Sequence, residues 1–404
     1  MKISPYKVYK FCVYSIVFLN LGFLNIIGTF DRQAMFFSII LGLFSFIVYF
    51  FDKDRIPIKR GKDLVLTISL IVGIFIFQLF RIQYEGMTRK AAFTTFGGLL
   101  LVLVSFPIYE LLQRQFKKVL NFLVKIGFVA IIIRIILWLF YNFLHLNLGR
   151  GFFEGRENWT RNILGLSLVR ISEPYISGFL FIICIVGLYK NNIFKRRIDN
   201  IYGIIILYFY AFFVSQTRMQ ILVYTIVLVL MLLIQAWNSK KYVLFIIEFL
   251  LILIILVANK DLIETFFYSF NPNSITGYST TLRINSMNYF YNEWVNSNKW
   301  LGFGFTPDAH ILGISTYWIS DFEIYINLFE FGFIGFVILV YPILKGIILS
   351  LKFLKKNKIY SNLLIGLTIF ILVSLENIYL LNLATLAPIY FGLMLFVENK
   401  SIEK

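Results

Sequence analysis

The sequence predicts an all-α polytopic membrane protein with about twelve transmembrane helices. Of its 404 residues, 59% are hydrophobic and only 15% are charged, and the mean hydropathy is +0.80. Soluble domains average about 45–50% apolar and about 25% charged residues, so this composition excludes a soluble enzyme, a disordered chain and a disulfide scaffold. The two cysteines, Cys12 and Cys184, both lie inside apolar runs, which argues against a disulfide framework and a cysteine metal site.

Twelve apolar runs predict the membrane spans, because a helix needs about 20 mostly apolar residues to cross a bilayer. They lie near residues 11–30, 35–51, 64–80, 91–109, 119–144, 175–189, 201–215, 219–237, 243–258, 322–344, 360–375 and 377–397. The first run follows the basic segment Met1–Lys10, but it is as long as a span and lacks a small-residue cleavage site. We therefore expect a membrane helix there and not a cleaved signal peptide.

The distribution of basic residues predicts which side of the membrane each loop faces. With the N-terminus inside, the cytoplasmic segments carry 24 of the 38 Lys and Arg residues and the outer segments 12. This excess follows the positive-inside rule and places both termini in the cytoplasm. The net charge of +17 then indicates contact with an anionic leaflet, and we expect no nucleic-acid partner.

A long outer loop over residues 259–320, between predicted spans nine and ten, interrupts a single membrane domain that covers residues 1–404. Loops of this length are usually functional or disordered, and fourteen aromatic residues argue for a folded loop. Within it, Ile284, Met287, Tyr291 and Trp294 recur at helical spacing and predict a short amphipathic helix, which we expect the Gly302-Phe-Gly304 turn to end. We expect this loop to lie over the outer membrane face.

Three arginines and one glutamate near the outer face are candidates for binding a substrate. Arg218 lies in a very short turn, Ser215-Gln-Thr-Arg218, where it either anchors at the headgroups or grips a phosphate with its planar guanidinium. Arg283 lies in the long loop, where a solvated side chain is the simpler interpretation. Arg170 and Glu173 precede span six; Glu173 and Pro174 suit a helix start, whereas the charge of Arg170 is unfavourable there and needs an acidic partner or ligand.

Candidate proton acceptors follow in the second half of the long loop. His310 is one of only two histidines and lies beside Asp308, while Asp321 opens span ten. A neutral imidazole is a competent general base near pH 7, although His310 can equally be a surface residue and Asp321 a first-turn carboxylate. Arg134 and Glu248 are charges inside predicted spans, where pairing or snorkelling is the simpler interpretation.

This combination of side chains suits a lipid-pyrophosphate sugar donor. Arginines suit a pyrophosphate, a carboxylate or histidine suits a hydroxyl proton, and aromatic faces suit sugar rings. The sequence contains no Walker motif, dinucleotide fingerprint, HExxH or Gly-x-Ser-x-Gly elbow.

Three stretches of the chain resemble the Wzy/O-antigen ligase superfamily of bacterial surface-polysaccharide enzymes. They are Arg170-Ile-Ser-Glu-Pro, Ser215-Gln-Thr-Arg218, and the block from Arg283 through Trp300-Leu-Gly-Phe-Gly304 and Asp321 to Leu328-Phe-Glu-Phe-Gly-Phe-Ile-Gly335. Each motif alone is short, and it is their order and sidedness over roughly residues 165–340 that carry the resemblance.

The resemblance implies a GT-C-like glycosyltransferase in the bacterial cytoplasmic membrane that uses an undecaprenyl-pyrophosphate-linked oligosaccharide, with no nucleotide sugar, cofactor or obligatory metal. By analogy, Arg218 and Arg283 would bind the pyrophosphate, with Arg170 as a third candidate. Glu173, Trp294 and Trp300 would contact the glycan. Membrane lipids are further partners, and the family leaves room for a chain-length regulator.

The same resemblance leaves the acceptor open. In the ligase branch a histidine near the end of the loop is the proposed base, whereas this chain has Asp321 at that position and His310 eleven residues earlier. That departure favours a polymerase over a ligase. A flippase for lipid-linked oligosaccharides is the alternative from another class, but it would concentrate its charges in a central cavity, whereas the notable charges here lie outside.

Overall fold

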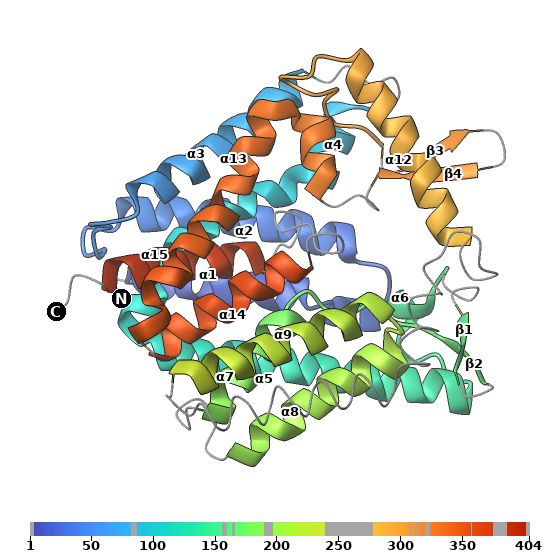
Figure 1. The fold of residues 1–404 in the computed structure, drawn as a ribbon, viewed down its shortest axis with the longest axis horizontal. Helices are drawn as coiled ribbons and strands as arrows, with labels where there is room; N and C mark the ends of the chain where they lie inside the picture. The colour runs from blue at the N-terminus through green and yellow to red at the C-terminus, as the bar shows by residue number, and fades with distance from the viewer. Residues whose placement is uncertain are drawn as a thin grey trace.

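The computed structural model describes residues 4–81, 87–155, 160–163, 166–189, 197–238, 278–307, 309–312, 315–319, 324–356, 358–374 and 386–400. Over these residues the protein is mostly helical, with two short antiparallel β-hairpins at one end (Figure 1). The helices are α1 (Pro5–Asn20), α2 (Asp31–Phe51), α3 (Lys62–Phe80), α4 (Arg89–Phe96), α5 (Ser105–Leu144), α6 (Arg150–Phe153), α7 (Ser177–Tyr189), α8 (Arg197–Phe209), α9 (Arg218–Asn238), α12 (Tyr278–Asn296), α13 (Ile324–Phe353), α14 (Ile359–Val373) and α15 (Leu386–Lys400). The hairpins pair β1 (Thr160–Ile163) with β2 (Leu166–Val169) and β3 (Ala309–Leu312) with β4 (Ser315–Trp318).

The helices follow the apolar runs of the sequence. Within the described residues, six helical segments are long and apolar enough to cross a membrane, and three more apolar helices are shorter. Most of the predicted spans coincide with described helices. The run near 91–109 instead passes through α4, a 3₁₀-helix over Gly97–Val104 and the start of α5. The run near 243–258 and residues 377–385 of the last run lie outside the described residues. The chain is therefore a helical membrane protein, and the full count of twelve spans stays a prediction.

The longest apolar segment, Arg89–Leu144, is two predicted spans joined at a kink. As one straight helix its 56 residues would extend about 84 Å, far more than the roughly 30 Å of a hydrocarbon core. Gln115 has φ −143° and ψ 47°, which breaks α5. Arg114 just before the break donates to Asp54 O (2.6 Å) and pairs with Glu110 (2.6 Å), so the kink lies beside the loop between α2 and α3.

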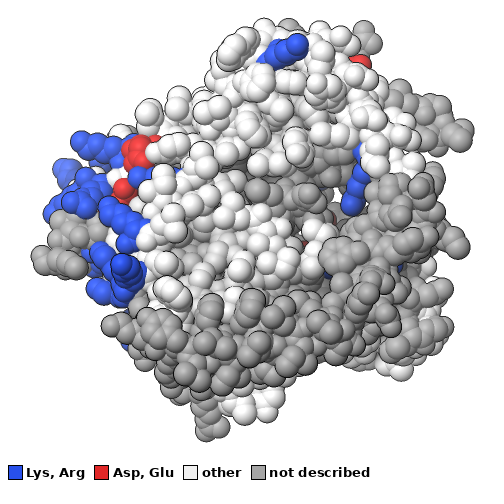
Figure 2. Space-filling view, in the orientation of Figure 1, with Lys and Arg blue, Asp and Glu red and all other residues white. Residues whose placement is uncertain are grey.

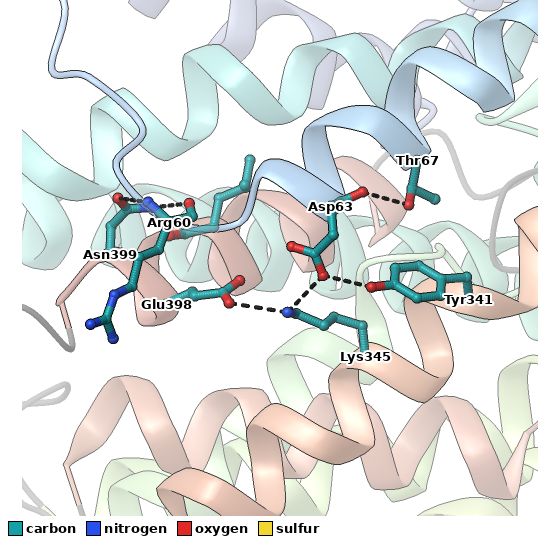
Figure 3. Close-up of polar contacts among 8 residues, drawn as sticks. Arg60, Asp63, Thr67, Tyr341, Lys345, Glu398 and Asn399 are labelled. Atoms are coloured by element: carbon teal, nitrogen blue, oxygen red, sulfur yellow. Dashed lines mark hydrogen bonds and ion pairs between the residues drawn. The ribbon is translucent and has the colours of Figure 1, made fainter.

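Lysines and arginines gather at one end of the molecule, which we call the basic end (Figure 2). α1 begins and α15 finishes at this end (Figure 1). There Lys345 Nζ of α13 lies 2.7 Å from Asp63 Oδ2 of α3 and 3.0 Å from Glu398 Oε1 of α15, and Tyr341 donates to Asp63 (2.6 Å) (Figure 3). These contacts tie three helices together at the basic end, and the side of the membrane that this end faces stays a prediction.

The opposite end carries what we call the lid: α12, the loop 297–307 and the hairpin β3–β4. It has its own small core, formed by Phe290, Trp294, Phe303, Ile319, Ile326 and Phe329. The predicted amphipathic helix is present as α12, but its buried face differs from the expected one. Ser286, Phe290 and Trp294 are buried, whereas Ile284 and Tyr291 are about half exposed, because the lid core lies on the side of α12 that faces α13.

The lid contacts the membrane-spanning helices at a break in α13. Gly332 has φ 64° and ψ −170°, a conformation open only to glycine, and residues 299–304, which we call the docking loop, fill the break. Four backbone hydrogen bonds join the two segments: Phe303 N to Phe329 O (3.0 Å), Gly304 N to Glu330 O (3.0 Å), Phe333 N to Lys299 O (3.0 Å) and Ile334 N to Trp300 O (3.2 Å). The expectation that the Gly302-Phe-Gly304 turn ends the helix was wrong: α12 ends at Asn296, and Gly302 allows close contact with the backbone of α13.

Replacing Gly332 by alanine is expected to destabilise the protein strongly. A Cβ at this position would lie 2.4 Å from Trp300 C and O and from Gly302 N, and the backbone would keep a conformation that alanine avoids. We expect a loss of at least about 2 kcal/mol in the free energy of unfolding. The measurement is the thermal-unfolding midpoint in detergent.

Gly73→Ala on α3 is the matched control, because nothing lies within 4 Å of a Cβ there. Alanine is favoured over glycine in a helix by about 0.5–1 kcal/mol, so this variant should match or exceed the wild type. Equal midpoints for Gly332→Ala and the wild type would contradict the tight docking of the loop.

Candidate functional site

The segments singled out in the sequence lie at the end of the molecule away from the basic end. α7 and α9 begin there, next to β1–β2, and α12 covers the same end (Figure 1). The site is therefore built from irregular backbone at the ends of helices, which needs partners for its polar groups. Buried side chains from neighbouring helices supply many of those partners.

The turn that carries Arg218 has an unusual backbone. α8 continues into a π-helix over Tyr210–Val214, and Gln216 then adopts φ 53°, a conformation that is uncommon for a residue other than glycine. π-Helical turns and such backbone conformations are frequent at functional sites. The Gln216 side chain is buried, and its Nε2 donates to Phe213 O (3.2 Å) and to Leu168 O (3.3 Å).

Arg218 is exposed and is the first residue of α9, as the sequence predicts for a helix that starts after a short turn. A cation is unfavourable at a helix N-terminus, where the partial charge of the helix is positive. An anion at this point would meet both the guanidinium and the first N–H groups of the helix.

The segment 169–174 is held by α5 and by the π-helix. Arg134 donates from Nη1 to Ser172 O (2.9 Å) and from Nη2 to Leu21 O (2.8 Å), and its guanidinium packs over the Phe152 ring. Further hydrogen bonds run from Trp138 Nε1 to Val169 O (2.8 Å), from Ile171 N to Val214 O (3.0 Å) and from Tyr210 Oη to Ser172 O (3.1 Å). Arg134 is 6% exposed, so this charge inside a predicted span holds backbone and is not a surface ligand.

Glu173 lies in the segment before α7 and its carboxylate is engaged inside the protein. Tyr224 of α9 donates a hydrogen bond to Glu173 Oε1, and Ser177 donates a second. Burial raises the pKa of Glu173 to about 7, against the lowering effects of both hydroxyls and of Arg134. Pro174 does not open α7 directly; the helix begins at Ser177, whose N–H donates to Pro174 O (2.9 Å).

Two side chains at the end of α3 bind the docking loop, and neither was predicted from the sequence. Gln78 Nε2 donates to Leu301 O (2.8 Å) and to Glu330 O (3.2 Å). Arg81 donates to Leu301 O (2.9 Å) and to Gly302 O (3.0 Å), and burial lowers the pKa of its guanidinium. In the sequence Arg81 is one of several basic residues that follow apolar runs and Tyr224 is one of many aromatic residues, so only the tertiary contacts single them out.

The remaining predicted site residues fall on the lid or outside the described residues. Arg283 is exposed on α12, and Arg170 is half-buried directly after β2. Trp294 is 6% exposed and packs against Phe329 and Phe333, whereas Trp300 is 66% exposed. His310 lies on β3; Asp308, Asp321 and Glu248 lie outside the described residues.

The structure therefore links some of the predicted residues and separates others. Gln216 and the Ile171–Val214 hydrogen bond join the turn of Arg218 to the segment of Arg170 and Glu173. Arg283 and both tryptophans belong to the lid, which is a separate element. In the parts of the chain that the structure describes, no group of three His, Cys, Asp or Glu side chains could hold a metal ion.

The buried Glu173 carboxyl predicts a pH-dependent stability. Because its folded pKa, about 7, exceeds the ordinary value of 4.5, the folded protein keeps a proton that the unfolded chain loses between these values. Stability should therefore fall as pH rises through this window, by at most about 1.4 kcal/mol per pH unit, and Glu173→Gln should remove that contribution. Melting in detergent from pH 4.5 to 8 tests this; Glu154→Gln, at an exposed carboxyl, serves as the control. An unchanged slope in Glu173→Gln would refute the assignment.

These contacts define the candidate site. Protein-family models, curated proteins and solved structures all give no match to this chain. The function therefore rests on the residues themselves and on their arrangement.

Proposed function

We propose that this protein is a membrane glycosyltransferase that polymerises a surface polysaccharide. It would transfer a glycan from undecaprenyl pyrophosphate to a hydroxyl of an incoming lipid-linked repeat unit at the outer face of a bacterial cytoplasmic membrane. The observation that carries the proposal is the link between two arginine-bearing segments: the buried Gln216 bonds the Arg218 turn to Leu168, two residues before Arg170.

The leaving group explains the need for arginines. As the bond between the anomeric carbon and the pyrophosphate oxygen breaks, negative charge develops on the pyrophosphate. A guanidinium binds phosphate oxygens through two parallel N–H donors, and donors placed where charge develops lower the barrier. Arg218, which is exposed at the start of α9, suits this role, and Arg170 and Arg283 are the further candidates.

The second half of the reaction needs a proton acceptor. The acceptor hydroxyl forms the new glycosidic bond as its proton passes to a base, and the products are the longer glycan and undecaprenyl pyrophosphate. His310, Asp308 and Asp321 are the proposed bases, and His310 lies on the hairpin that packs beside α12. An exposed aromatic ring such as Trp300 suits contact with a sugar or a lipid, whereas Trp294 in this arrangement supports the lid core.

Deletion of the protein in its native host separates the proposal from its alternatives. Single repeat units that accumulate on lipid at the outer face, with no long polymer, support a polymerase. Long polymer that remains on lipid indicates a ligase with the same arginines. Single repeats that stay at the inner face indicate a flippase and refute the proposed roles of the arginines.

Arg218→Ala is expected to abolish polymer while the protein stays in the membrane. Loss of a donor to developing charge costs at least about 100-fold in rate, and Arg218 is exposed, so its removal should not affect folding. Arg218→Lys, which keeps the charge but loses the planar fork, should give an intermediate result. The readout is polymer length and amount on a gel, with the protein level from an immunoblot.

Arg32→Ala is the matched control, because Arg32 is also exposed and opens α2 at the same end of the molecule. It should leave the polymer unchanged. Normal polymer in Arg218→Ala would eliminate the pyrophosphate role of this residue.

A further inference from the structure

One face of α13 is apolar and exposed from the break at Gly332 to the basic end. Phe333, Val337, Leu344, Ile348 and Leu351 are each at least 42% exposed. Their spacing places them on one side of the helix, and no charged residue lies among them on that side. Lys345, the one charged residue in this stretch of α13, turns inward to Asp63 and Glu398. An exposed apolar face on a membrane-spanning helix is the face that contacts lipid.

The length of this face matches a bilayer. From Phe333 to Leu351 the helix rises about 27 Å, close to the roughly 30 Å of a hydrocarbon core. Lys352, Lys355 and Lys356 follow directly at the basic end. The face therefore ends in cations on one side, and its other end marks the level of the opposite headgroups.

Trp300 lies at that other end. The residue is 66% exposed, and its ring centroid is 6.0 Å from that of Phe333, the first residue of the apolar face. The backbone bonds from Ile334 N to Trp300 O and from Phe333 N to Lys299 O fix the tryptophan to the helix. On the inner side, Gln78 and Arg81 hold the next two residues of the docking loop.

We infer that Trp300 is an interfacial anchor whose ring lies among the phospholipid headgroups of the leaflet opposite the basic end. An indole combines a large apolar surface with one N–H donor, and it is enriched at this depth of the bilayer. The exposed ring contacts the boundary between headgroups and acyl chains, because it continues the lipid-facing side of α13. Trp300 therefore holds the docking loop, the part of the lid that is bonded to α13, at the membrane surface.

This anchor also has a consequence that rests on the proposed function. A docking loop at headgroup depth lies at the level of the phosphates of a lipid-linked donor. The lid would then meet its substrate at the membrane surface and not in bulk water. The anchor itself stands without the proposed function, because its test measures no activity.

The test is tryptophan quenching in the full-length protein reconstituted into phosphatidylcholine vesicles. The lipids carry bromine either near the headgroup or deep in the acyl chain, and iodide serves as the quencher in water. Subtracting the emission of Trp300→Phe from that of the wild type isolates Trp300, and phenylalanine keeps a ring against Phe333. We expect the Trp300 emission to be mostly lost with shallow bromine, less reduced with deep bromine and largely protected from iodide.

Two other tryptophans calibrate the measurement. Trp138 is 2% exposed and donates to Val169 O, so the emission lost in Trp138→Phe should resist all the quenchers. Trp237 is 58% exposed near the end of α9 and reports an accessible ring. Iodide quenching of Trp300 without bromine quenching would place it in water, and resistance to every quencher would mean that protein, such as a second copy of this chain, covers it. Either result overturns the anchor.

Discussion

The break in α13 at Gly332 is the constraint on which the outer half of the molecule depends. Within a membrane every backbone N–H and C=O needs a partner inside the protein, so an interrupted helix must be completed by another segment. Here the docking loop supplies that segment through four backbone hydrogen bonds. Two glycines make this possible, since a side chain on Gly332 or on Gly302 would collide with the opposite backbone. The lid is consequently part of the helix packing and not a loose insertion.

The same requirement explains why so many polar side chains are buried at this end. Arg134, Trp138 and Gln216 donate to carbonyls of the segment 168–172, and Gln78 and Arg81 donate to those of the docking loop. Each of these side chains comes from a helix or turn that is distant in sequence from the backbone it supports. A buried polar group is costly without a partner, so these contacts fix the irregular segments in one arrangement.

The basic end is organised by a different interaction. Lys345 lies between Asp63 and Glu398 and joins α3, α13 and α15 (Figure 3). The two ends are thus stabilised differently. Ion pairs join the helices at the basic end, whereas side chains that bind backbone carbonyls hold the irregular segments at the other end. The arginines proposed to bind substrate lie at the second end, where Arg218 is exposed to solvent.

The sequence by itself determined the helical membrane class, because apolar run length and charge pattern are local properties that a bilayer selects directly. It also placed the start of α9 close to Arg218 and the boundary between two apolar runs between residues 109 and 119, whereas the structure joins those two runs in one kinked helix. It could not determine the buried face of α12, since Ile284 and Trp294 are both apolar and only the position of α13 decides which is covered. The tertiary structure likewise decided the partners of Glu173, the hydrogen bonds of Arg81 to the docking loop and those of Arg134 to Ser172 and Leu21. Each of them is a contact between residues far apart in the chain, and no spacing along one segment encodes such a contact.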